Sequence, residues 1–134
     1  MVRVSKVTVE SVELRFPSPG GKVLSINDSY ASNWQAKRRI LEPWRDLVGW
    51  SWQMLPIRVR STIINVPCTV HVTIPFLIRR GRDPHNYVGT VCKALVDQLV
   101  MQGVWPDDTP QWVTVVEPTL VKGSEVIVRL VPRP

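Results

Sequence analysis

Hydrophobic and polar positions alternate in different ways along this chain, and each pattern predicts an element. A β-branched run from Val7 to Phe16, ended by a Pro- and Gly-rich segment at 17–21, predicts a first strand of about ten residues. Between Asn33 and Val48, apolar residues recur at helical spacing. Because Pro43 interrupts that pattern, we expect a kinked helix or two abutting helices. Residues 50–66 show no clear period and predict an irregular connection, with room for a short strand.

The second half of the chain predicts the rest of a sheet and a second helix. Residues 68–74, 112–117 and 125–131 are rich in β-branched side chains and predict three strands. For the helix between the first two of these strands, Asp83 is a suitable N-cap, Pro84 suits the first helical position and Gly103 is a natural stop. The order β-α-β-α-β-β predicts an α+β fold: a single domain over residues 1–134, with a mixed β-sheet and two main helices packed on it.

The predicted second helix has an apolar face and a polar face. Its buried stripe consists of Val88, Val91, Leu95 and Leu99. At 100° per residue, four polar residues fall within an arc of roughly 60° on another side, namely Asn86, Thr90, Lys93 and Asp97. We expect the first face to pack on the sheet and the second to present an amide, a hydroxyl, an ammonium and a carboxylate.

Composition and charge narrow the class of partner. The 134 residues are 44% hydrophobic and 21% charged, which is typical of a globular domain. Lys and Arg number 17 against 11 Asp and Glu, and the resulting charge of +6 favours a polyanionic partner such as nucleic acid or an acidic membrane. No apolar run approaches the roughly 20 residues that a membrane helix needs, and the start lacks the apolar core of a signal peptide. We therefore expect a cytoplasmic protein without a membrane partner.

Charged residues with complementary chemistry gather between Arg79 and Asp108. A basic loop with Arg79, Arg80 and Arg82 leads into Asp83-Pro84-His85-Asn86, and the helix that follows carries Lys93 and Asp97 before the paired carboxylates Asp107 and Asp108. Hydrolysis of a phosphodiester requires an activated water and stabilisation of the charge that builds on the phosphate, which a carboxylate-held metal can supply. Carboxylates at both ends of one helix, beside cationic side chains, favour a metal site next to a phosphodiester.

These residues, in this order, resemble the RusA-type Holliday junction resolvases, which are common in phages and prophages. The matching motifs are the Arg-rich loop, the Asp-x-x-Asn start at Asp83, the helix with Lys93 and Asp97, and the segment Gly103-Val104-Trp105-Pro106-Asp107-Asp108. The likeness extends to a closing hairpin around Lys122-Gly123 and, more loosely, to the early loop Asn27-Asp28-Ser29-Tyr30. It covers the C-terminal half closely and the N-terminal half in outline.

The resemblance implies a homodimeric, magnesium-dependent endonuclease that cuts four-way DNA junctions in recombination and repair, in a bacterial host cell and without an organic cofactor. It places the catalytic, metal-binding carboxylates at Asp83 and at the pair Asp107 and Asp108, of which Asp108 is the closer match. The functional helix lysine maps onto Lys93 if residues 87–90 are an insertion after Asn86. The residues expected to contact DNA are Arg79, Arg80, Arg82 and Asn86, with Lys37, Arg38 and Arg39 extending the basic track.

His85 departs from the pattern, because many members of the family have a second aspartate at that place. Magnesium prefers oxygen ligands, whereas imidazole suits Mn²⁺ or Zn²⁺ better. The change implies one metal instead of two, a different choice between Mg²⁺ and Mn²⁺, a weaker enzyme, or a catalytic role for His85 in carrying a proton. The alternative function is a junction-binding protein whose catalysis is weakened or lost. A third hypothesis is a basic nucleic-acid module unrelated to resolvases.

Each candidate residue also has a purely structural interpretation. Asp83 serves as an N-cap, Asp107 and Asp108 as turn residues, and Lys93 with Asp97 as a surface ion pair. His85 is an exposed helix-start residue in this interpretation, the basic track on the first helix is a solvated face, and most tryptophans belong to the core or a dimer contact. Cys68 and Cys92 lack the paired spacing of a zinc site and are expected to be small buried residues.

Overall fold

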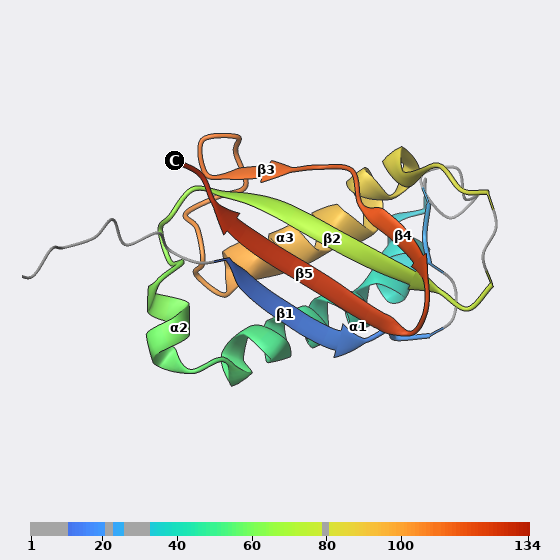
Figure 1. Cartoon of the computed structure of the whole chain (residues 1–134). Coiled ribbons are helices and arrows are strands. Elements are labelled where there is room, and N and C mark those ends of the chain that lie inside the picture. The colour runs from blue at the N-terminus through green and yellow to red at the C-terminus, as the bar shows by residue number, and fades with distance from the viewer. Residues whose placement is uncertain (1–10, 21–22, 26–32, 79–80) are drawn as a thin grey trace, which may run out of the picture.

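The chain folds as five strands in one sheet with helices on one side, as the computed structural model in Figure 1 shows for residues 11–20, 23–25, 33–78 and 81–134. The strands are β1 (Val12–Pro17), β2 (Cys68–Phe76), β3 (Val113–Val115), β4 (Thr119–Lys122) and β5 (Glu125–Pro132). The helices are α1 (Trp34–Met54), α2 (Ile57–Ser61) and α3 (Lys93–Met101), and α3 is preceded by a 3₁₀ turn η2 (Pro84–Tyr87) and a π turn η3 (Val88–Cys92). The predicted α+β fold with a mixed sheet is confirmed.

The sheet is built around β2, which has three strand neighbours. The strand order is β1-β5-β2-β3. β3 pairs with the first residues of β2, Cys68–Val70, and β4 pairs with its last residues, Thr73–Phe76. β5 is antiparallel to both β1 and β2, whereas β3 and β4 run parallel to β2. A parallel neighbour requires a long crossover, and the segment η2-η3-α3 supplies it between β2 and β3. The turn at Gly123 and Ser124 then leads into β5 on the other side of β2. The expected hairpin around Lys122-Gly123 is therefore wrong, because β4 and β5 each pair with β2 and not with each other.

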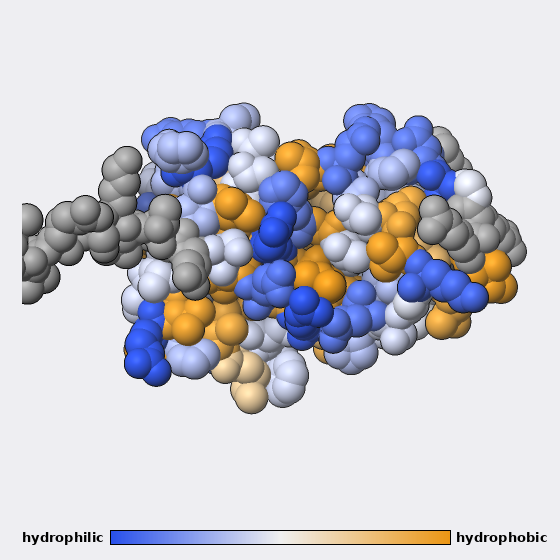
Figure 2. Space-filling view, viewed as in Figure 1, coloured by the Kyte–Doolittle hydropathy of each residue, from blue (hydrophilic) through white to orange (hydrophobic). Residues whose placement is uncertain are grey.

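The core lies between the sheet and the helices α1 and α3, which run together behind the sheet in Figure 1. Alternate residues of the strands point into it, because successive side chains of a strand face opposite sides. The buried set includes Leu14, Phe16, Val70, Val72, Val126, Val128 and Leu130 from the sheet and Trp44, Val48, Trp52, Leu95 and Leu99 from the helices. The opposite face of the sheet carries polar and charged residues among apolar ones, as Figure 2 shows.

Helix α1 is longer and more regular than the sequence predicts. It runs without interruption from Trp34 to Met54, with Pro43 inside it, so the prediction of two abutting helices is wrong. Pro43 is exposed, and the buried residues Trp44, Val48 and Trp52 continue the apolar stripe beyond it. Burial of this stripe holds the helix together across the hydrogen bond that proline cannot donate.

Two further segments differ from the predicted ones. Residues 50–66, predicted as irregular, contain the last turn of α1 and the short helix α2. β4 was not predicted, because its four residues are too few for a clear period. The predicted first strand is confirmed over Val12–Pro17, while residues 7–10 lie outside the described residues. Within the described ranges, no helix combines the length and apolar character needed to cross a bilayer.

The second helix begins differently from the predicted regular α-helix. Asp83 is the N-cap as predicted and its side chain accepts from the N–H of His85, but the first turns are 3₁₀ and then π. A 3₁₀ turn has fewer residues per turn than an α-helix and a π turn has more. The rotation of 100° per residue therefore does not predict which side chains share a face between Asn86 and Lys93. The predicted shared polar face is therefore wrong for Thr90, which is 2% exposed and donates to the carbonyl of Leu24 over 2.6 Å.

Candidate functional site

Lys93 lies between two carboxylates that come from different parts of the chain. Its Nζ donates to Asp97 Oδ1 at 3.3 Å and to Asp108 Oδ2 at 3.2 Å. Asp97 is one turn further along α3, whereas Asp108 is fifteen positions away, in the segment after the helix. The pair predicted as a surface ion contact within the helix is thus present, and a second carboxylate joins it.

Arg45 extends this group of charges onto α1. Its Nη2 lies 4.0 Å from Asp97 Oδ2, so positive and negative side chains alternate from Arg45 through Asp97 and Lys93 to Asp108. We call these four residues the charged cluster. The side chain of Lys93 is 56% exposed and that of Asp108 45%, so both are open to a ligand from solvent.

The surroundings of Lys93 keep it charged. Its partial burial by itself lowers the pKa, but the hydrogen bond to Asp108 and the charge of Asp97 outweigh that effect, and the pKa of Lys93 lies above its ordinary value. Lys93 is therefore an ammonium ion at neutral pH. Such a group can donate hydrogen bonds and neutralise an anion, but it does not act as a base.

A sharp turn after α3 brings Asp108 to Lys93. Gly103 has φ +86°, its N–H donates to the carbonyl of Val100, and the N–H of Val104 donates to that of Leu99, which is the Schellman arrangement. The predicted helix stop at Gly103 is confirmed. Trp105 then anchors the segment, since it is 2% exposed and its Nε1 donates to the carbonyl of Val66 over 2.8 Å.

The paired aspartates have different surroundings. Asp107 Oδ1 accepts from the side chain and the N–H of Thr109, and these two hydrogen bonds hold the pKa of Asp107 below its ordinary value. Asp107 is thus a turn residue, as the structural interpretation of the sequence expects. Asp108 is the member of the pair that contacts Lys93.

Asp83 and His85 lie in the 3₁₀ turn at the start of the crossover. Asp83 Oδ1 accepts from the N–H of His85 at 3.0 Å. The His85 Nδ1 lies 3.6 Å from Glu117 Oε1, and both side chains are mostly exposed. Within the described ranges, no hydrogen bond or ion pair links Asp83 to Asp108, and no three His, Cys, Asp or Glu side chains gather closely enough to hold a metal.

The predicted DNA-contacting residues are described only in part. Arg79 and Arg80 lie outside the described residues, whereas Arg82 donates to the carbonyl of Ile78 and its Cζ lies 3.9 Å from the Phe76 ring centroid. Asn86 is half-buried in η2. On α1, Arg38 lies over the Trp34 ring and near Glu42, and its neighbours Lys37 and Arg39 form no ion pair within 4.0 Å with any described residue.

The donor chemistry of this region suits a hard cation. Asp97 and Asp108 already share one positive charge, that of the Lys93 ammonium, and carboxylate oxygens are the ligands that Mg²⁺ prefers. Magnesium commonly uses only one or two protein carboxylates, together with waters and substrate phosphates. Such a binding mode does not require three carboxylates close together, and Asp108 and Asp83 each offer oxygen donors of the type that it uses.

The two cysteines take no part in this chemistry. Burial raises the pKa of Cys68 to about 11 and that of Cys92 to about 12, so both thiols stay protonated at neutral pH. Their predicted burial is confirmed.

Sequence reasoning missed two residues of this region, Arg45 and Glu117. Arg45 is seven positions after Arg38 and so lies on the same side of α1, which is a signal that the sequence contains. Glu117 lies between β3 and β4, and its approach to His85 depends on sheet pairing that no local pattern shows. No protein-family model matches the chain, and no curated protein matches it either. The likeness to RusA-type resolvases rests on the residues themselves.

Proposed function

We propose that this protein is a structure-specific DNA endonuclease of the RusA type, which resolves four-way junctions by metal-dependent phosphodiester hydrolysis. The observation that carries the proposal is the contact between Lys93 and Asp108, 3.2 Å apart. The resemblance takes these residues from separate motifs and implies that they serve one reaction. Their contact supports the alignment that treats residues 87–90 as an insertion, because these residues fall in η2 and η3, ahead of α3.

Each side chain has a chemical role in this proposal. Asp83 and Asp108 would hold Mg²⁺ or Mn²⁺, and the bound ion would supply an activated water and stabilise charge on the phosphate. Lys93, held as an ammonium ion, donates to a phosphate oxygen that enters beside Asp108. Arg82 and the basic track on α1 contact neighbouring phosphates, which adds affinity without sequence preference. His85, exposed beside Glu117, exchanges a proton with solvent.

The cellular setting belongs to the same proposal. Paired cuts across a junction require two active sites, so the protein would act as a homodimer. Its DNA substrate would place it in the cytoplasm of a bacterial host cell, in phage or prophage recombination and repair.

A cleavage assay on a synthetic four-way junction tests this function. Wild-type protein with Mg²⁺ or Mn²⁺ is expected to nick the junction at paired sites, and Asp108→Asn is expected to abolish cutting while junction binding survives. The matched control is Glu125→Gln, an exposed carboxylate at the start of β5 paired with Arg15, which should cut like the wild type. Absence of cleavage by the wild type with both metals would contradict the enzymatic proposal.

A second candidate function is a junction-binding protein with weakened or lost catalysis. This function is favoured by His85, which stands where many RusA-type resolvases have a second aspartate. Its side chain lies near that of Glu117. His85→Asp should then raise cleavage, whereas the control His85→Asn, which adds no charge, should not. Equal affinity for duplex and junction, with a steep salt dependence, would instead indicate a general basic nucleic-acid module.

A further inference from the structure

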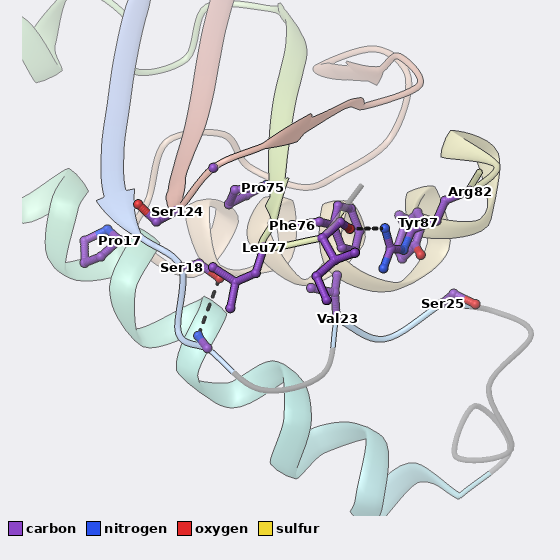
Figure 3. Close-up of a pocket in the computed structure, with 13 residues that line it drawn as sticks. Pro17, Ser18, Val23, Ser25, Pro75, Phe76, Leu77, Arg82, Tyr87 and Ser124 are labelled. Carbon is purple, nitrogen blue, oxygen red and sulfur yellow. Dashed lines mark hydrogen bonds between the residues drawn. The ribbon is translucent and has the colours of Figure 1, made fainter. Parts of the chain in front are cut away.

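A pocket of about 580 Å³ opens where β1 and β2 end, beside the 3₁₀ turn η2. Its volume lies in the range of pockets that bind small organic groups, roughly 300–1,000 Å³. Figure 3 shows Phe76, Tyr87 and Arg82 together at one end of the pocket and Ser18 and Ser124 at the other. Among its described residues, the pocket therefore combines flat apolar surfaces, a guanidinium and hydroxyl groups.

Flat groups form the first end of the pocket. The rings of Phe76 and Tyr87 meet edge to face, with centroids 5.7 Å apart. The guanidinium of Arg82 lies over the Phe76 ring at 3.9 Å and is fixed there by a 3.0 Å hydrogen bond to the carbonyl of Ile78. Guanidinium planes and aromatic rings are the groups on which proteins stack unpaired bases.

The rim of the pocket exposes two consecutive aliphatic side chains. Leu77 is 80% exposed and Ile78 63%, immediately before the Arg-rich segment. Exposed apolar side chains that adjoin one another at a pocket are a feature of ligand-binding surfaces. A ligand that combines a flat apolar part with negative charge, as a nucleotide does, fits these surroundings.

The pocket is one peptide bond away from Asp83, a proposed metal ligand. Arg82 lines the pocket, and Asp83, the next residue, caps η2. A DNA strand whose phosphate approaches Asp83 therefore has its neighbouring nucleotide close to the pocket mouth.

We propose that this pocket receives one unpaired nucleobase of the bound DNA strand. The base stacks against the planar surface formed by Arg82 and the aromatic rings, while its polar edge faces the serine hydroxyls. This inference rests on the proposed function, because unpaired or unstacked bases are available at a branch point. It adds a base contact to a site otherwise built to hold phosphates.

Binding of a short oligonucleotide and its abasic counterpart tests the inference without any cleavage. A fluorescein-labelled dT₁₀ and an abasic chain of the same length and charge are titrated with protein in EDTA, and affinity is read by anisotropy. Wild type should bind dT₁₀ at least about fivefold more tightly, the lower end of measured base-stacking effects. Leu77→Asp, a charge at the pocket mouth, should remove the difference.

The matched control is Met101→Asp, an equally exposed apolar residue at the end of α3, which should keep the base preference. Equal affinity of wild type for the two chains, no binding of either, or a preference that survives Leu77→Asp would overturn the pocket assignment. Thermal unfolding of both variants checks that they are folded. A base preference without junction cleavage would refute the nuclease alone, and cleavage without a base preference would refute the pocket alone.

Discussion

At the scale of single residues, the position of Lys93 has the clearest consequence. The ammonium contacts two carboxylates but is more than half exposed, so a phosphate oxygen can replace one of them. A positioned cation of this kind typically contributes about 10²- to 10³-fold to the rate of a reaction that develops negative charge.

Lys93→Gln is expected to slow single-turnover junction cleavage by about 10²- to 10³-fold with little loss of junction affinity. The reason is that the amide keeps a donor but not the charge. Lys122→Gln, which removes an exposed lysine at the end of β4, is the control and should cut normally. An equal decrease in the cleavage rate of both variants would mean that the rate depends only on the net charge of the protein.

The raised pKa of Lys93 also predicts how stability depends on pH. A group whose pKa is higher in the folded than in the unfolded state stabilises the fold fully below the unfolded value, about 10.4 for lysine, and this contribution is lost as pH rises through the folded value. Wild type should therefore exceed Lys93→Gln in unfolding free energy by a small, constant amount near neutral pH. Urea titrations should show the gap closing above about pH 10.5.

Local chemistry was enough to predict several residues of the site, and tertiary contacts explain the rest. The Asp83 cap, the Gly103 stop and the buried cysteines follow from what each side chain does to its own backbone or its own hydration. The partnership of Arg45 with Asp97 joins two helices, and that of Glu117 with His85 joins the sheet to a loop. Neither contact can be predicted from a short stretch of sequence, because each joins residues from different elements.

At the scale of elements, the crossover between β2 and β3 determines where the charges meet. The 3₁₀ and π turns before α3 change the rotation of the chain, and the buried hydroxyl of Thr90 ties this irregular stretch to Leu24. The sequence predicted a helix here but not its change of period, because a single hydrophobic stripe is compatible with either winding over so few residues. Non-α turns of this type are frequent at functional sites.

Gly103→Ala is expected to destabilise the protein by about 1 kcal/mol and to lower cleavage further than that loss of stability explains. The added Cβ would meet no atom within 4 Å, so the cost comes from the φ of +86° alone. Strain at this turn displaces Asp108 from Lys93. The control is Gly123→Ala, which also meets no atom within 4 Å and has no positive φ, and its urea midpoint should stay near wild type.

At the scale of the whole molecule, the helices leave one face of the sheet open. The class of fold could be predicted because strand and helix periods differ clearly in most segments. The strand order could not, since the placement of β5 between β1 and β2 is a matter of long-range register. The short β4 is a second parallel neighbour of β2, and the hydrophobic pattern of the sequence did not predict it.

The proposed paired cutting predicts a homodimer. Sedimentation should give about twice the chain mass of 15.3 kDa at concentrations where junction cleavage is paired. Dilution below the dimer constant should convert paired nicks into single ones on the same substrate. Paired nicking by a species that sediments as a monomer would contradict the dimer.

The position of β3 at the edge of the sheet affects how stably the contact between Lys93 and Asp108 is held. β3 has only three residues, pairs with β2 alone, and begins a few residues after Asp108. Short edge strands are the first parts of a sheet to open, with free energies well below that of global unfolding. Amide hydrogen exchange should therefore find Val113–Val115 less protected than β5. Each such opening would release Asp108 from Lys93 while the rest of the sheet stays paired.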